Sequence, residues 1–417
     1  MSFSYGKNLK IQVFGQSHAA AIGVVLDGLP AGEPVELEPI RQLMARRAPG
    51  HGAPGLSTAR READEPEILC GLVEGRTVGA PLAAVIRNTD VRSADYANLR
   101  GAAADKGAAE PAVPLQAKAT PPAAAAENAA PGSAPVGPAG AAAMPDAALG
   151  GLRVPRPGHS DWPAFVRYGG AADVRGGGAF SGRMTAPLCF AGGVALQLLA
   201  RRGVQVYAHI ASIGGIADAV PDPCAPDAAA LAAVRGKAFP TLSDEAGAAM
   251  QAAIRRAAAV GDSVGGSIRC IVTGLPAGVG AHMFDGVENR LSAAAFGIPG
   301  VRGIEFGSGF LGCEGLGSEQ NDPYCWQNGC VRTVKNDAGG VLGGATTGMP
   351  LVFRLALKPT PSIGQPQHSV DLAARTDTEL TVRGRHDPCI VHRAVPVAEA
   401  VTALALLDLL LDPPAVW

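Results

Sequence analysis

Three short loops carry the residues of this sequence that are best suited to moving protons. His18 stands at the front of an apolar run, residues 15–32 (GQSHAAAIGVVLDGLPAG), where a core residue would ordinarily be apolar. His159 lies in RPGHSD, and Asp387 lies beside a histidine in GRHDPC. Imidazole and carboxylate groups that Gly and Pro turns hold in place can act as general acids and bases. For the last two loops, a solvated polar turn is the alternative interpretation.

A duplication within the chain distinguishes His18 from an ordinary core histidine. Residues 261–278 (GDSVGGSIRCIVTGLPAG) align with residues 15–32 without a gap, and both copies end in the turn-forming pentapeptide GLPAG. Helical patterns follow the two copies, at residues 37–47 and 284–297. The position that matches His18 is Val264. Because this backbone accepts an apolar residue there, we expect His18 to serve function rather than the fold.

The basic residues favour a small anionic ligand over a nucleic acid. Of the 35 basic residues 28 are Arg, which binds phosphate and carboxylate groups in a bidentate manner. Many lie in Gly-rich loops, and the loop at residues 154–184 leads into an apolar helical pattern that begins at Thr185. A Gly-rich turn that opens a helix is a good place for an anion. The net charge of −2 argues against a general nucleic-acid surface.

The composition indicates in which compartment the protein lies and argues against metal sites and membrane-spanning segments. Eight Cys residues show no CxxC pair and no Cys/His zinc spacing, so we expect reduced thiols, a cytoplasmic protein and no metal. The first ten residues lack the apolar run of a signal peptide, and the C-terminal run at 401–411 is too short and acidic to span a membrane. Residues 101–150 are rich in Ala, Pro and Gly, which predicts a disordered and dispensable insertion.

The remaining patterns predict a mixed fold with long loops. Two strands and a helix are expected at residues 204–216, 350–363 and 243–260. The segment 298–350 is predicted to be mostly Gly-rich loop. Within it GSGFLG (307–312) has the spacing of a dinucleotide fingerprint, which requires a helix to open at its third Gly. The residues that follow do not favour a long helix, so a flavin- or NAD(P)-dependent oxidoreductase is the weaker alternative.

Seven ordered stretches resemble the motifs of one family, the chorismate synthases. They are GQSHAAAIGVVLDGLPAG (15–32), NTDVRSADY (88–96), RPGHSD (156–161), RGGGAFSGRMTA (175–186), AGGVLGGATTG (338–348), ALKPTPS (356–362) and GRHDPC…AVPVAEA (384–400). The resemblance covers nearly the whole chain except residues 101–150. It therefore predicts one domain, formed by residues 1–100 and 151–417. It implies an α+β fold, a β-α-β sandwich with helices between antiparallel sheets, and a homotetramer.

The resemblance also implies a lyase of the shikimate pathway, which leads to the aromatic amino acids. Members of the family convert 5-enolpyruvylshikimate 3-phosphate to chorismate by 1,4-elimination of phosphate and a ring hydrogen. The reaction needs reduced FMN, although it causes no net redox change. Some members reduce their own flavin with NADPH, and the resemblance leaves this point open for this chain.

Matching positions imply roles for individual residues. His18 would help protonate the departing phosphate, His159 would stabilise the protonation state of the reduced flavin, and Asp387 would take the ring proton, relayed through flavin N5. The residues expected to bind the anionic substrate are Ser17, Arg47, Arg156, Ser181, Arg183 and Arg385. The residues expected to bind FMN are Gly343, Lys358, Pro359, Thr360, Pro361, Ser362 and Arg385.

The chain departs from the family pattern at several positions. The residues that differ from the usual types are Gln16, Ala19, Ala179, Phe180, Met184 and Asp337. Gly55 stands near the place of a missing Arg, and Arg60 and Arg61 are the candidates to substitute for it. These departures raise a second alternative, a non-catalytic relative that binds flavin or an anion without turnover. Because all three expected acid–base residues are present, we expect an active enzyme.

Overall fold

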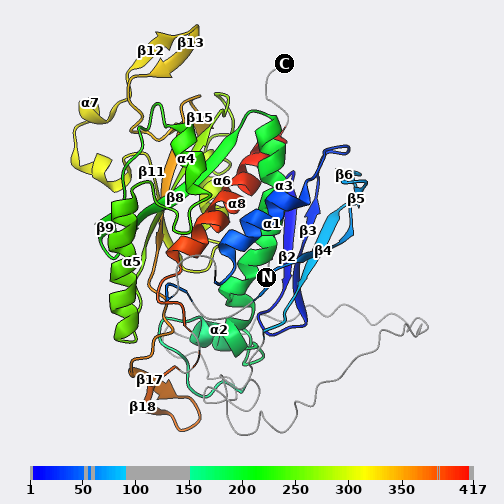
Figure 1. Cartoon of the computed structure of the whole chain (residues 1–417), viewed down its shortest axis with the longest axis vertical. Helices are drawn as coiled ribbons and strands as arrows, with labels where there is room; N and C mark the ends of the chain where they lie inside the picture. The colour runs from blue at the N-terminus through cyan, green and yellow to red at the C-terminus, as the bar shows by residue number, and fades with distance from the viewer. Residues whose placement is uncertain are drawn as a thin grey trace, which may run out of the picture.

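Two antiparallel sheets form layers of the molecule, and helices fill the space between them (Figure 1). The computed structural model describes residues 3–50, 55–57, 62–90, 151–382, 384 and 386–412. The predicted insertion at residues 101–150 lies outside the described residues, as do Arg60, Arg61 and Arg385.

The first sheet positions the His18 turn. Its described strands are, in spatial order, β1 (Ser4–Tyr5), β2 (Lys10–Gly15), β3 (Ala21–Asp27), β7 (Leu82–Arg87) and β4 (Pro66–Cys70). Strands β2 and β3 form a hairpin in which Gly15 lies opposite Ile22. His18 therefore lies in the turn just before β3, rather than in the strand itself.

The second sheet repeats this arrangement. Its described strands are, in spatial order, β11 (Val301–Phe306), β16 (Leu351–Leu357), β10 (Gly266–Thr273), β8 (Gln205–Ile213) and β9 (Ile216–Ala217). Strands β8 and β16 confirm the two strands predicted at residues 204–216 and 350–363. Side chains of β10 such as Ile268, Cys270 and Val272 are buried in the main core.

Helices join the two sheets. The helices of this middle layer are α1 (Leu37–Arg47), α3 (Thr185–Arg201), α6 (Val287–Ala295) and α8 (Val391–Leu410). Helix α3 packs against the first sheet, α8 packs against the second, and the two helices contact each other. A Cβ atom on Gly192 of α3 would lie 2.3 Å from the Cβ of Ala400 on α8, so only glycine permits this approach. The predicted sandwich of helices between antiparallel sheets is confirmed.

The duplicated unit is visible in the fold. In the first copy β3 leads through the GLPAG turn into α1, and in the second copy β10 leads through the same turn into α6. Each copy supplies the central strand of its sheet. Helix α1 has the predicted bounds, whereas α6 is shorter than residues 284–297 because it begins after Gly286 and ends before Phe296.

Smaller elements surround the sandwich. The remaining described helices are α2 (Asp161–Arg167), α4 (Ala228–Val234), α5 (Asp244–Ala259) and α7 (Gly317–Gln320). The short hairpins pair β5 (Leu72–Val73) with β6 (Arg76–Thr77), β12 (Tyr324–Gln327) with β13 (Cys330–Thr333), β14 (Val341–Leu342) with β15 (Ala345–Thr346), and β17 (Gln367–Asp371) with β18 (Thr376–Leu380). Ser243 Oγ accepts a hydrogen bond from the Ala246 N–H at 3.1 Å, which caps the predicted helix α5.

The segment 298–350 contains more regular structure than the sequence predicted. It holds β11 and two hairpins, one of which closes through Asn328 and Gly329, both with positive φ. An Asn-Gly pair of this kind favours a tight hairpin turn. Gly312 lies inside a short 3-10 helix (Gly309–Glu314), and the next helix of the described chain is the four-residue α7. No long helix opens at the third Gly in the described chain, so the fingerprint interpretation of GSGFLG is excluded.

Helix α3 is long and apolar, but it is a core helix. Among the described residues, only the stretch Arg175–Arg201, which includes α3, has the length and hydropathy to cross a membrane. Within its apolar 18-residue part, 78% is buried inside the molecule. Its neighbours on both sides are α1 and α8, together with strands of the first sheet.

Candidate active site

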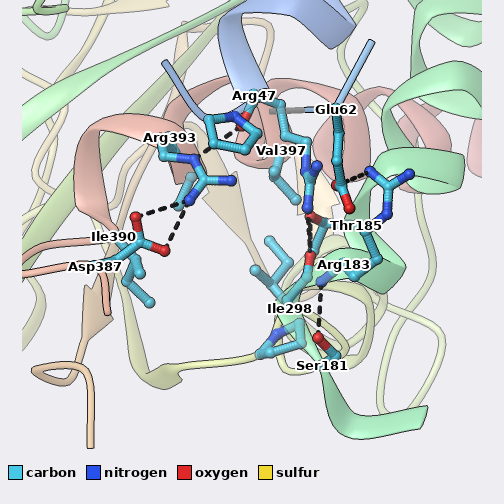
Figure 2. A pocket seen from close by; sticks show the side chains of 14 residues that line it. Arg47, Glu62, Ser181, Arg183, Thr185, Ile298, Asp387, Ile390, Arg393 and Val397 are labelled. Atoms are coloured by element: carbon cyan, nitrogen blue, oxygen red, sulfur yellow. Dashed lines mark hydrogen bonds and ion pairs between the residues drawn. The ribbon is translucent and has the colours of Figure 1, made fainter. Parts of the chain in front are cut away.

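A cavity of about 190 Å³ lies where α1 ends and where α3 and α8 begin (Figure 2). Four of the predicted site residues line it: Arg47 from α1, Ser181 and Arg183 from the loop before α3, and Asp387 from the turn before α8. Its apolar wall includes Ile298, Pro299, Ile390, Ala394 and Val397. The fold therefore brings these predicted residues from distant parts of the sequence to one cavity, which Glu62 and Arg393 also line.

Arg47 is held rigidly at the end of α1. Its Nε donates to Thr185 Oγ1 at 3.0 Å, its Nη1 donates to Asp64 at 2.8 Å, and its Nη2 donates to the Gly182 carbonyl at 2.9 Å. The residue is only 4% exposed. Because both the helix end and the loop before α3 contact it, Arg47 fixes the spacing between these two walls of the cavity.

Arg183 is buried, and one of its nitrogens is left without a partner. Its Nε donates to Asn88 Oδ1 at 3.0 Å, and its Nη1 pairs with Glu62 at 2.6 Å and with Asp64. Burial lowers the pKa of Arg183 below its usual range, and the charges of Asp64 and Glu62 oppose that shift. Among the described residues, its buried Nη2 has no hydrogen-bond partner. An anionic ligand in the cavity would complete this donor set.

An arginine that sequence reasoning missed orients Asp387. Both carboxylate oxygens of Asp387 accept hydrogen bonds from Arg393 Nη1, at 2.9 and 2.8 Å. Arg393 Nε also donates to the Arg47 carbonyl at 3.1 Å. Figure 2 shows this chain of contacts on one side of the cavity. The first turn of α8 thereby locks the carboxylate to the end of α1.

The His18 turn lies against the Gly-rich loop that leads to α3. The Ser17 N–H donates to the Gly178 carbonyl at 3.1 Å. A Cβ atom on Gly176, which has φ +59°, would lie 2.5 Å from His18 Cε1 and 2.6 Å from Ser17 Oγ. Only glycine allows this contact, so the glycine at position 176 lets the RGGGAF stretch pack directly on the turn. Ser17 is fully buried, and its Oγ has no hydrogen-bond partner among the described residues.

An acidic residue lies close to His18. Asp173 accepts hydrogen bonds from Gln16 Nε2 at 3.2 Å and from Arg175 at 2.9 Å. Burial raises the pKa of Asp173, but the hydrogen bonds and charge of Arg175 and the charge of His18 outweigh it and lower the pKa overall. Gln16 thus contacts this carboxylate through its side-chain amide.

His159 is half-buried and does not line the cavity. Its Nε2 lies 2.8 Å from Ser362 Oγ, and burial, followed by the charge of Arg156, lowers its pKa to about 4. The imidazole is therefore neutral at pH 7. Arg156 is 4% exposed and forms a bidentate pair with Asp161 at 2.8 Å, at the start of α2. Arg156 and His159 do not line the cavity; His386, adjacent to Asp387, is close enough to influence the pKa of His159.

The segment of residues 358–362 suits an anionic cofactor. Lys358 Nζ donates to the Gly158 carbonyl at 2.5 Å, which places the RPGHSD loop beside this segment. Thr360 Oγ1 is buried and has no partner among the described residues. A basic side chain, an unused hydroxyl and a neutral imidazole at Ser362 are groups that can receive a phosphate or a flavin ring. The residues present therefore fit the FMN that the sequence predicted.

Two predicted site residues stand apart from these clusters. Gly343 lies in the turn between β14 and β15, away from α2 (Figure 1), and does not line the cavity. Arg385 lies outside the described residues. Two of the departures from the family pattern, Ala179 and Met184, line a second cavity of about 300 Å³ that is mostly apolar. Both positions contribute apolar side chains to this cavity.

Sequence reasoning missed four residues that hold the site together. They are Glu62, Asp64, Asn88 and Arg393. The sequence around three of them carried signals: Asn88 opens the NTDVRSADY motif, and Glu62 directly follows an arginine pair, with Asp64 two residues further on. Their roles, however, depend on partners that lie far away in the chain.

Comparison with known proteins identifies the family. The sequence profile described as chorismate synthase matches residues 9–411 of this chain. The chain belongs to the chorismate synthase family. The chorismate synthase of Korarchaeum cryptofilum is 37% identical over 404 residues, covering 97% of this chain and 96% of the relative. That of Thermococcus gammatolerans is 38% identical, covering 97% of each chain.

A solved structure agrees with this assignment at the level of the fold. A crystal structure of a chorismate synthase superposes with a TM-score of 0.68 and 22% sequence identity. The match covers 98% of this chain and 93% of the other. The α+β sandwich predicted from the resemblance is therefore the fold of the family.

Proposed function

We propose that this chain converts 5-enolpyruvylshikimate 3-phosphate to chorismate, a carbon–oxygen lyase reaction of the shikimate pathway. In this 1,4-elimination a ring C–H bond and the C–O bond to phosphate break, and a new ring double bond forms. The observation that carries the proposal is the convergence of Arg47, Arg183 and Asp387 on one cavity in a chorismate synthase family member. A substrate with two carboxylates and a phosphate calls for such guanidinium donors.

The proton transfers are divided between Asp387, which lines the cavity, and His18, which does not line it but lies in a turn joined to Arg183 through Asn88. Asp387, held by Arg393, takes up the proton that leaves the ring. His18 donates a proton to the departing phosphate, which neutralises charge on the leaving group. The unpartnered Oγ of Ser17 and Nη2 of Arg183 donate hydrogen bonds to the anionic groups of the substrate. Ser181, Arg156 and Arg385 complete this proposed substrate set.

We propose reduced FMN as the cofactor, held by residues 358–362 and, from their motif positions, Gly343 and Arg385. When bound, the reduced flavin supplies electron density that promotes the loss of phosphate without net redox change. The unused Thr360 hydroxyl and the Lys358 ammonium group support this placement. His159, neutral at pH 7, stabilises the protonation state of the bound flavin. We further propose a cytoplasmic homotetramer, and the eight unpaired cysteines are in keeping with a reducing compartment.

The test is an anaerobic assay of the purified chain with 5-enolpyruvylshikimate 3-phosphate and chemically reduced FMN. Chorismate and phosphate are measured together, with oxidised FMN as the control. We expect equal amounts of both products with reduced FMN and neither with oxidised FMN. Flavin binding without either product would instead support the non-catalytic relative, and net oxidation of the substrate would support the oxidoreductase.

A further inference from the structure

Asn88, the residue directly after β7, contacts two parts of the site at once. Its Nδ2 donates to the Ala19 carbonyl at 2.7 Å and to the Gln16 carbonyl at 3.3 Å. These carbonyls lie on either side of His18. Its Oδ1 accepts a hydrogen bond from Arg183 Nε at 3.0 Å. One side-chain amide therefore joins the His18 turn to a guanidinium group that lines the cavity.

The contact to Arg183 decides which nitrogen is left for a ligand. Asn88 engages Nε, and the acids Glu62 and Asp64 engage Nη1. The buried Nη2 is the nitrogen that has no partner among the described residues. A guanidinium group is planar, so fixing Nε and Nη1 also fixes the direction in which Nη2 points.

The side chain of Asn88 is not needed to form the hairpin beneath it. The backbone N–H of Asn88 donates to the Ala20 carbonyl at 3.1 Å, and β3 and β7 continue that pairing from Ala21 and Arg87. The side chain is half-buried rather than part of the apolar core. The hydrogen bonds of this side chain therefore join the turn and Arg183, and none of them pairs the strands of the sheet.

We propose that Asn88 is a positioning residue that holds His18 and Arg183 at a fixed separation, so that both act on the same leaving phosphate. The inference rests on the proposed function. Only an amide can donate twice and accept once from this position. An Asp residue keeps the acceptor for Arg183 but cannot donate to the two carbonyls, and a Leu residue keeps neither contact. Comparing these two substitutions therefore separates the support of the His18 turn from the support of Arg183.

The chain offers a matched control in Gln197 of α3. Its Nε2 donates to two backbone carbonyls, of Glu36 at 2.8 Å and of Gly193 at 3.3 Å, and its Oε1 accepts from the Glu36 N–H at 2.8 Å. Gln197 does not line the cavity. Gln197→Glu thus makes the same chemical change as Asn88→Asp in a similar bonding pattern away from the site.

The experiment measures kcat and KM under anaerobic conditions with reduced FMN. For Asn88→Asp we expect kcat to fall about 10- to 100-fold with KM within about threefold of the wild type, because displacing a reacting group is costly. Asn88→Leu should also raise KM about tenfold, since Arg183 loses its support. In a His18→Ala background Asn88→Asp should have little further effect on kcat. Gln197→Glu should stay within about twofold of the wild type.

A second measurement does not depend on turnover. Hydrogen exchange of the backbone amides in residues 15–21 should quicken in both Asn88 variants and not in Gln197→Glu. Wild-type kcat in Asn88→Asp, or unchanged exchange in that turn, would overturn the proposal. So would an equal loss of kcat from Asn88→Asp with and without His18. If the wild-type chain made no chorismate, the proposed function would fail, and hydrogen exchange alone would decide whether Asn88 holds the turn.

Discussion

In the first copy of the duplicated unit, the turn before the central strand carries Ser17 and His18; in the second copy, the matching residues are Ser263 and Val264. Ser17 Oγ is buried and has no partner among the described residues. Ser263 Oγ donates to the Thr360 carbonyl at 2.6 Å. The same backbone thus leaves a hydroxyl available in one copy and uses it internally in the other.

The residues that follow differ in the same way. Val264 packs against the main core, and its N–H donates to the Pro388 carbonyl at 2.9 Å. The second turn therefore holds the two loops that carry the proposed cofactor segment and Asp387. The first turn instead presents His18 under the Gly-rich loop that leads to Arg183. In the proposed function, the first copy thus carries the reactive histidine, and the second copy supports the loops around the site.

The largest effect should come from Asp387, which lies next to the loop that the second copy supports. We expect Asp387→Asn to lower kcat about 10²- to 10⁴-fold while the chain stays folded, because the proposed proton acceptor is lost. Asp371→Asn is the control, since it breaks an ion pair with Arg153 (2.7 Å) away from the cavity. Anaerobic chorismate formation measures both. A rate near that of the wild type in Asp387→Asn would remove this carboxylate from the mechanism.

Acid should destabilise the side of the site that contains His159. Its folded-state pKa of about 4 lies below the usual 6.5, so the unfolded chain binds this proton first as the pH falls. Protonation of His159 does not change the free energy of unfolding above about pH 6.5. As the pH falls from there to about 4, it lowers that free energy by about 3 kcal/mol. His159→Gln should lose less stability than the wild type between these pH values in urea titrations. Parallel curves for the two proteins would contradict a half-buried imidazole that is neutral in the folded chain.

The two matching serines should respond in opposite ways. Ser263→Ala should lower the free energy of unfolding by about 1 kcal/mol, because the Thr360 carbonyl loses its donor. Ser17→Ala should leave stability unchanged or raise it, and should increase KM about three- to tenfold. Denaturant unfolding and steady-state kinetics measure the pair. Equal losses of stability in both variants would show that the two hydroxyls have the same structural task.

Much of this comparison could be predicted from the sequence, because local patterns carry it. The GLPAG turns, the bounds of α1 and the mismatch between His18 and Val264 all follow from short-range periodicity and alignment. The contacts that hold the candidate site together could not be predicted in the same way. The pairing of Arg393 with Asp387 and of Asn88 with Arg183 arises only when α8, β7 and the loop before α3 meet in space. The Asn328–Gly329 pair favours a hairpin turn and could have predicted this hairpin. The many glycines of the segment 298–350 led instead to the prediction of a loop.

The most direct test gives the first copy the residue of the second, as His18→Val. Phosphate release is followed in a single anaerobic turnover with reduced FMN, and thermal unfolding is measured on the same samples. Because the backbone accepts Val264 at the matching position, we expect an unchanged unfolding temperature and phosphate release slowed at least about a hundredfold. Phosphate release at the wild-type rate from a folded His18→Val protein would contradict the assignment of chemistry to the first copy.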